Sequence, residues 1–145
     1  MVYEGPQITR AILKGLAKRL GSEPKDECWY ICDAESGSVL YLGLREDVDA
    51  AAFAAATANG EVLDLLRSFN PRPGDFFHVP AGTLHSIGAG LTLVEIQQNS
   101  DTTYRVHDWD RIGLDGKSRE LHRDEALQSI AFGRHASGPL RASVG

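Results

Sequence analysis

The stretch from Gly74 to Gly88 constrains the fold of this 145-residue chain more than any other part of the sequence. It reads GDFFHVPAGTLHSIG: a glycine, five residues, a Pro-x-Gly turn, two residues and a histidine. This pattern predicts a turn into a short strand and then a sharp reversal at Pro80-x-Gly82. His85 follows on the next strand, where a neutral imidazole on a rigid backbone is a good ligand for a divalent metal. A structural, half-buried histidine is the alternative interpretation of His85.

Strand and helix signals alternate at short intervals along the rest of the chain. Branched and aromatic residues predict strands, whereas helical apolar spacing or a high alanine content predicts helices. The predicted strands are Glu27–Cys32, Val39–Leu44, Phe76–Val79, Leu91–Gln98 and Thr102–Asp108, and the predicted helices are Arg10–Leu20, Asp47–Asn59, Val62–Phe69 and Arg119–Ile130. The first two strands, joined by a turn at residues 35–38, are expected to form a hairpin. Together these elements predict a mainly β chain, a small barrel or sandwich with helices at one end.

The whole chain, residues 1–145, is expected to form one domain, because its length is near the usual domain size of roughly 100–150 residues. Hydrophobic residues make up 42% and charged residues 24%, which is ordinary for a soluble globular protein. The tail from about Gly133 onward is expected to be loosely held.

Charge and cysteine content exclude several classes of protein. The formal net charge is −5, and such a surface repels phosphate backbones, so nucleic acid is not expected as a partner. The two cysteines, Cys28 and Cys32, argue against a disulfide scaffold. No run approaches the ~18 apolar residues of a membrane span, and the first residues lack the features of a signal peptide. We therefore expect a cytoplasmic protein without a membrane partner.

Three stretches carry a resemblance to a known family. Residues 74–88 match the second motif of the cupins. Lys25–Ile31 (KDECWYI) and Glu95–Val106 (EIQQNSDTTYRV), the latter followed by Asp108–Arg111 (DWDR), are similar to type I mannose-6-phosphate isomerases, the zinc-dependent phosphomannose isomerases of the cupin superfamily. The similarity also includes Arg119–His122 (RELH) and covers roughly residues 22 to 132. The chain thus resembles the central part of a family member, and the resemblance implies a cupin-type jelly-roll β-barrel with a few flanking helices.

The resemblance also implies roles for individual residues. Glu27 and His85 stand where family members bind zinc. Arg105 stands at the position of the proposed catalytic arginine, and Lys25 at that of a lysine in the substrate site. The resemblance therefore implies one zinc ion per chain and a small-molecule sugar phosphate as substrate, and it leaves homo-oligomerisation open.

One departure from the family pattern affects the metal site. The family has a further histidine ligand, in a Gln-x-His-Pro motif before the glutamate. The best counterpart in this chain begins at Gln7, and Thr9 stands in the place of the histidine. Threonine is a poor zinc ligand, and catalytic zinc usually has three protein ligands. Gln7 is the remaining candidate for a third ligand, through its side-chain carbonyl oxygen.

Strand periodicity gives an independent test of these assignments. In the first strand Glu27 shares a face with Trp29 and Ile31, so the two cysteines face the other way and are expected to be core thiols rather than ligands. Arg105 is expected to point inward, where an isolated guanidinium is costly and needs an anion. A salt bridge with Asp101 or another acid is the alternative to a substrate oxyanion.

The function implied by the resemblance is metal-dependent aldose–ketose isomerisation of mannose 6-phosphate and fructose 6-phosphate. Three alternatives remain open. The first is a degenerate cupin that binds a sugar or sugar phosphate without turnover. The second is another cupin metalloenzyme, such as an oxygenase, for which two or three histidine ligands would be expected. The third is a fragment that folds only with a partner chain.

Overall fold

The computed structural model describes residues 25–100, 103–108, 112–133 and 137–141, together with the backbone of two short N-terminal strands. These are β1 (Val2–Tyr3) and β2 (Gln7–Ile8). The predicted helix Arg10–Leu20 lies outside the described residues, as does Thr9.

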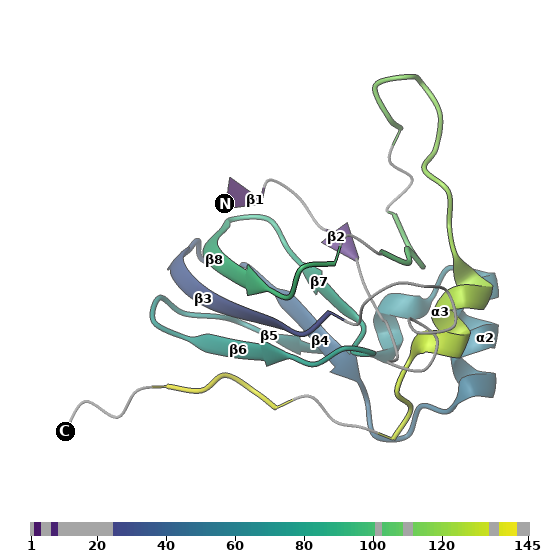
Figure 1. Ribbon diagram of the computed structural model, residues 1–145, viewed down its shortest axis with the longest axis horizontal. Helices are drawn as coiled ribbons and strands as arrows, with labels where there is room; N and C mark the ends of the chain where they lie inside the picture. The colour runs from purple at the N-terminus through teal and green to yellow at the C-terminus, as the bar shows by residue number, and fades with distance from the viewer. Residues whose placement is uncertain are drawn as a thin grey trace.

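Two antiparallel four-stranded sheets form the body of the molecule (Figure 1), with strand orders β1-β8-β3-β6 and β2-β7-β4-β5. The other strands are β3 (Glu27–Ala34), β4 (Leu40–Leu44), β5 (Leu66–Phe69), β6 (Phe76–Val79), β7 (His85–Ile87) and β8 (Leu91–Gln97). Apolar side chains from both sheets pack together between them, including Trp29 and Phe77 from one sheet and Leu40 and Leu42 from the other. The expected mainly β fold is confirmed.

Helices lie at one end of the two sheets (Figure 1). They are α2 (Ala50–Asn59), the single 3-10 turn η1 (Val62–Leu65) and α3 (Arg123–Ser129). Helix α2 begins where the Asp49 carboxylate accepts a hydrogen bond of 2.8 Å from the backbone N–H of Ala52. It ends at Gly60, whose φ of 77° suits glycine in a left-handed helix cap. No helix in the described part of the chain is long and apolar enough to cross a membrane.

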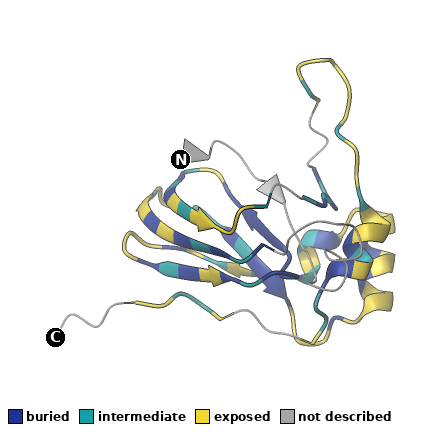
Figure 2. Cartoon of the chain, viewed as in Figure 1, coloured by how far each residue is buried: buried dark blue, intermediate teal, exposed yellow. Residues whose placement is uncertain are grey.

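The helices cover a second apolar cluster beyond the end of the sheets. It joins Phe53 of α2 and Ala126 of α3 to Leu84, Tyr104 and Val106. Figure 2 shows buried residues along the strands of both sheets and on the parts of the helices nearest to the sheets. The segment around residue 105 is therefore packed on the chain that leads into β7.

The prediction that the first two predicted strands form a hairpin is wrong. β3 pairs with β6 and β8, whereas β4 pairs with β5 and β7 in the other sheet. The inner faces of both strands are fully apolar, and Trp29, Ile31, Leu40 and Leu42 all have an exposed fraction of 0%. The two strands face each other across the core, because this arrangement buries both apolar faces.

Other elements also differ from expectation, and the predicted helix Asp47–Asn59 begins only at Ala50. The predicted helix Val62–Phe69 is one 3-10 turn followed by β5, because the second half pairs with the edge of β4. Residues 103–108 contain no strand. Instead, the backbone N–H of His122 donates to the Arg105 carbonyl oxygen at 2.7 Å, and the Arg105 N–H donates to His122 Nδ1 at 3.2 Å. The last helix begins at Arg123 rather than Arg119.

The cysteines lie on the outer face of β3, as the alternation predicts, but they are not core thiols. Cys28 is half-buried and Cys32 is exposed. Their neighbours on this face, Tyr30, Val94 and Ile96, are 49%, 48% and 69% exposed. Among the described residues no layer covers this face, so its side chains remain accessible.

Asp75, in the turn before β6, provides a pH-dependent contribution to stability. Its carboxylate accepts a hydrogen bond of 2.7 Å from Arg141 Nε and one of 3.0 Å from the backbone N–H of Arg72. The bond from Arg141, together with the Arg72 N–H, holds the pKa of Asp75 below its ordinary value of 3.8. Because the folded pKa is the lower one, this stabilisation is complete above the unfolded pKa and is lost as pH falls through the folded pKa.

We therefore expect Asp75→Asn to lower the free energy of unfolding at pH 7 and to flatten its decline below about pH 4. Urea unfolding between pH 7 and pH 2.5 measures both effects. Equal slopes for wild type and variant below pH 4 would contradict this role of Asp75.

Candidate functional site

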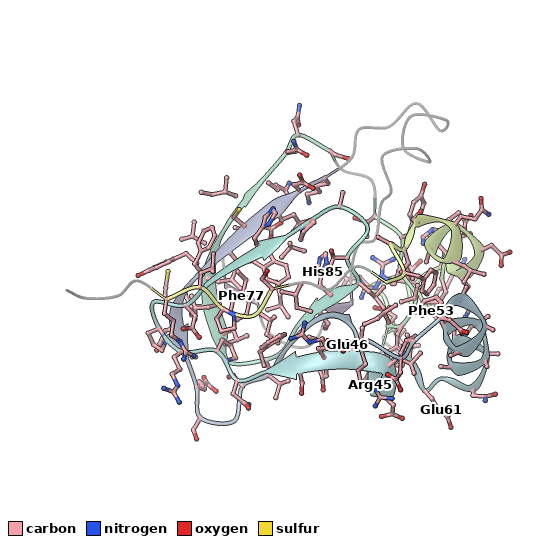
Figure 3. The ribbon with its side chains drawn as sticks, turned by 90° about the horizontal axis from the view of Figure 1, so that it is seen from below. Arg45, Glu46, Phe53, Glu61, Phe77 and His85 are labelled. Carbon is pink, nitrogen blue, oxygen red and sulfur yellow. The ribbon has the colours of Figure 1, made fainter. Side chains whose placement is uncertain are left out.

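His85 is the first residue of β7 and lies in the interior. Its ring is 3% exposed and meets Trp29 edge-on, with ring centroids 5.0 Å apart. Figure 3 shows His85 among the side chains between the sheets, with Phe77, whereas the labelled Arg45 and Glu61 lie at the periphery. Nδ1 of His85 lies 2.9 Å from the Thr83 carbonyl oxygen. A carbonyl oxygen only accepts, so Nδ1 carries the proton in this contact, which leaves Nε2 as the nitrogen suited to a metal.

The Pro-x-Gly turn places His85 in this way. Gly82 has a φ of 85°, in the left-handed region that favours glycine, and the Thr83 N–H donates to the Pro80 carbonyl oxygen at 3.1 Å. The predicted chain reversal before His85 is therefore confirmed. The predicted position of His85, on the next strand and facing the interior, is confirmed as well.

Lys25 and Glu27 form a buried ion pair at the start of β3. Lys25 Nζ lies 3.2 Å from Glu27 Oε1 and 3.7 Å from Glu95 Oε1. The three side chains are 1%, 2% and 8% exposed. One ammonium group thus contacts two carboxylates away from water, and Lys25 Nζ makes no hydrogen bond within the described structure.

Sequence reasoning did not assign a role to Glu95. Its backbone pairs with that of Trp29, so Glu95 shares the inner face of the sheet and lies diagonally across from Glu27. The sequence carries a signal for this position, because Leu91, Leu93 and Glu95 alternate on one face of the strand.

Arg105 is held by polar contacts beside the apolar cluster under the helices. Its side chain is 18% exposed, and Nε lies 3.7 Å from Asp108 Oδ1. Nε is buried and has no hydrogen-bond partner in the described part of the chain. Burial lowers the pKa of Arg105 from its ordinary value, and Arg119 lowers it further, against the opposing effect of Asp108. The carboxylate that faces Arg105 is Asp108, whereas Asp101 lies outside the described residues.

Asp108 joins Arg105 to a second arginine. Its carboxylate accepts a hydrogen bond of 2.7 Å from Arg119 Nε and another from Arg119 Nη2. The Asp108 side chain is 9% exposed and that of Arg119 is 35% exposed, so this two-bond pairing is shielded from water on the carboxylate side. Asp108 and Arg119 carried no individual role in the sequence interpretation, although the stretches DWDR and RELH that contain them were singled out.

The described residues include two side chains that could bind a metal. Glu27 and His85 offer a carboxylate and an imidazole, which are donors that zinc prefers. No group of three histidine, cysteine, aspartate or glutamate side chains suited to a metal occurs among residues that the structure describes. The backbone of Gln7 pairs with Ile87, on the strand that carries His85. The donor types therefore fit zinc, but these two side chains are one fewer than the usual three.

Known proteins similar to this chain agree on one family, although no protein-family model matches. The probable mannose-6-phosphate isomerase GmuF of Bacillus subtilis is 44% identical over 112 residues, covering 77% of this chain and 35% of that protein. The mannose-6-phosphate isomerase of Streptococcus mutans is 38% identical over 117 residues, covering 81% of this chain and 37% of that protein. The chain thus spans about a third of the length of these curated relatives.

Solved structures show the same relationship in three dimensions. A crystal structure of the mannose 6-phosphate isomerase from Bacillus subtilis aligns with a TM-score of 0.85 and 33% identity, covering 93% of this chain and 44% of that one. A structure described as zinc-bound mannose 6-phosphate isomerase aligns with a TM-score of 0.59 at 13% identity, covering 99% of this chain and 57% of that one, which shows a shared fold. The expected cupin-type jelly roll and the resemblance to part of this family are confirmed.

Proposed function

We propose, from the homology of this chain to part of the mannose-6-phosphate isomerases, that it interconverts mannose 6-phosphate and fructose 6-phosphate with a bound divalent metal. The observation that carries the proposal is the combined match in sequence and fold, 33% identity at a TM-score of 0.85 over 93% of the chain. The chain spans only part of the length of these relatives, so their reaction is a proposal for this chain.

The chemistry requires three functions. A proton moves between C1 and C2 of the sugar through a cis-enediol or enediolate, so a base, a charge stabiliser and an anchor for the substrate are needed. We assign charge stabilisation to Arg105, because a shielded guanidinium whose Nε–H makes no hydrogen bond among the described residues is suited to a developing oxyanion. Lys25 is the candidate for binding sugar oxygens, and its Nζ makes ion pairs but no hydrogen bond among the described residues.

Glu27 and His85 would hold the metal, for which we propose zinc. A bound zinc ion supplies Lewis-acid polarisation of a sugar hydroxyl or carbonyl oxygen. The third ligand would come from outside the described side chains, with the Gln7 carbonyl oxygen as the candidate. Glu27 and His85 are both buried and are donor types that zinc prefers, which supports this assignment; a bound metal would share the Glu27 carboxylate with Lys25.

One observation favours a second candidate function, binding of a sugar phosphate without turnover. Thr9 stands where the family has a histidine ligand, and the described residues supply two metal donors rather than three. Weak metal binding would leave the substrate site in place and slow the isomerisation. The free thiols of Cys28 and Cys32 are compatible with the cytoplasm, which we propose as the compartment for either function.

The test is an isomerase assay on the purified chain with mannose 6-phosphate, comparing added zinc with added chelator. Turnover that zinc supports and the chelator removes is the expected result. If a folded and zinc-loaded sample binds fructose 6-phosphate by calorimetry but shows no turnover, the isomerase proposal is contradicted and sugar-phosphate binding becomes the proposed function.

Restoring the histidine tests the metal site directly. Thr9→His should raise zinc affinity, by about tenfold or more, because it supplies the third protein ligand. Competition with a zinc-sensitive dye measures the dissociation constant, and Thr9→Ala is the matched control. An unchanged affinity would show that residue 9 does not stand beside the metal.

A further inference from the structure

A pocket of about 390 Å³ lies between α2 and the segment that leads into α3. Its apolar wall includes Val62 and Val106, and its polar wall includes Asp108, Ser118, Arg119 and Arg123. Such a volume lies in the range of roughly 300–1,000 Å³ that is usual for small-molecule sites. The pocket is next to Arg105, because Asp108 belongs to the pocket wall and lies 3.7 Å from Arg105 Nε.

Positive charge is in excess around this pocket. Asp108 is the single acidic residue among the described residues that line it, and Arg119 and Arg123 are both cationic. The carboxylate of Asp108 is already bound by Arg119 Nε and Nη2. Arg105 adds a third guanidinium nearby, because its Nε lies 3.7 Å from Asp108 Oδ1. Arg105 and Arg119 together outweigh the single charge of Asp108, and Arg123 adds a further cation to the pocket wall, so the pocket favours an anion as its occupant.

The donors of this wall are available to a ligand. Arg119 is held by Asp108 through Nε and Nη2, and no partner within the described structure takes its Nη1. Arg123 is exposed, and its guanidinium makes neither a hydrogen bond nor an ion pair with any described residue. Arg119 is thus oriented in advance, which reduces the entropy lost when an anion binds.

We propose that this pocket binds the phosphate group of a phosphate monoester, through Arg119 Nη1, the guanidinium of Arg123 and the hydroxyl of Ser118. Planar guanidinium groups match phosphate oxygens with paired hydrogen bonds, and a neutral sugar offers no charge to balance them. The assignment of the phosphate to the proposed sugar-phosphate substrate rests on the proposed function. Arg105 contacts Asp108 but is not among the described residues that line the pocket, and we assign it to the sugar rather than to the phosphate.

The experiment measures binding separately from catalysis. Isothermal titration calorimetry with inorganic phosphate, fructose 6-phosphate and fructose is compared for wild type, Arg123→Gln and the control Arg45→Gln, an exposed arginine outside the pocket. Arg123→Gln should weaken both phosphate-containing ligands by at least tenfold, which is the usual effect of losing one charge-assisted hydrogen bond. Arg45→Gln should leave both dissociation constants within about twofold, because an exposed charge outside the site is screened by solvent.

Three outcomes would contradict the phosphate site. Phosphate binding could be unchanged in Arg123→Gln, or it could be weakened equally by Arg45→Gln, which would show non-specific attraction. Fructose could also bind as tightly as fructose 6-phosphate. Thermal unfolding of each variant confirms that it folds, and Arg119→Lys, which keeps the charge, gives a second test of the same wall.

Isomerase kinetics separate this proposal from the proposed function. If phosphate binding depends on Arg123 but the wild type shows no turnover, the isomerase proposal is contradicted and the phosphate site is supported. If Arg123→Gln turns over substrate with an unchanged KM, the isomerase proposal is supported and the phosphate site is contradicted. A raised KM with a nearly unchanged kcat is the result that supports both.

Discussion

Replacing Arg105 by alanine should lower kcat for mannose 6-phosphate by about 100- to 1,000-fold, the effect typical of removing one oxyanion-stabilising donor. The guanidinium is 18% exposed, and its buried Nε has no hydrogen-bond partner among the described residues, so it can bind a developing oxyanion. The fold should tolerate the loss. Asp108 keeps its two hydrogen bonds from Arg119, and no carboxylate is left unpaired. Steady-state kinetics with saturating zinc measure the effect, together with urea unfolding of the same sample.

Two controls define what this result means. Arg105→Lys keeps the positive charge but loses the fixed geometry of the guanidinium, so its kcat should fall between those of wild type and alanine. Arg45→Ala removes an exposed arginine outside the proposed site and should not change kcat. An undiminished kcat in Arg105→Ala would remove this residue from the mechanism.

Replacing Lys25 by methionine should cost about 3–5 kcal/mol of unfolding free energy, the usual effect of breaking a buried ion pair. Lys25 Nζ lies 3.2 Å from Glu27 and 3.7 Å from Glu95, and all three side chains are less than a tenth exposed. Without the ammonium group two carboxylates would remain close together away from water. Urea unfolding at pH 7 in the presence of a chelator measures the loss without a contribution from bound metal.

A double variant provides the matched control. Lys25→Met combined with Glu27→Gln removes one of the two carboxylate charges, so it should recover part of the lost stability. Recovery would assign the loss to uncompensated charge rather than to packing of the methionine. A stability of Lys25→Met equal to that of wild type would contradict the buried ion pair.

The parts of the fold that depend on neighbouring residues were predictable from sequence. The alternation of Glu27, Trp29 and Ile31 gave the correct inner face of β3. The end of α2 before Gly60 was predicted, whereas its start was placed at Asp47 and the helix begins at Ala50, after the Asp49 cap. The assignment of strands to sheets was not predictable in this way. β3 and β4 follow one another in sequence but lie in opposite sheets, because both carry an apolar face that the core must bury.

The same distinction applies to the candidate site: features set by neighbouring residues were predictable, and contacts between distant segments were not. His85 was predictable because its reversal is local, a Pro-x-Gly turn of fixed geometry. The contacts of Glu95 with Lys25, and of Arg119 with Asp108, join segments that are far apart or irregular in sequence. Periodicity places Glu95 on the inner face but does not name the residue that it meets. Thr102–Asp108 was predicted as a strand, whereas the Arg105 backbone bonds to His122, a contact with no periodic signal.

The most direct test of the isomerase proposal follows the reaction from both directions by phosphorus NMR. Zinc-loaded protein is added to mannose 6-phosphate alone in one sample and to fructose 6-phosphate alone in another. An isomerase must bring both samples to the same ratio of the two sugars, whatever its speed, because it lowers one barrier for both directions. We expect convergence to one ratio with zinc and none with chelator. Two samples that each retain their starting sugar, with folded and zinc-loaded protein, would contradict the account.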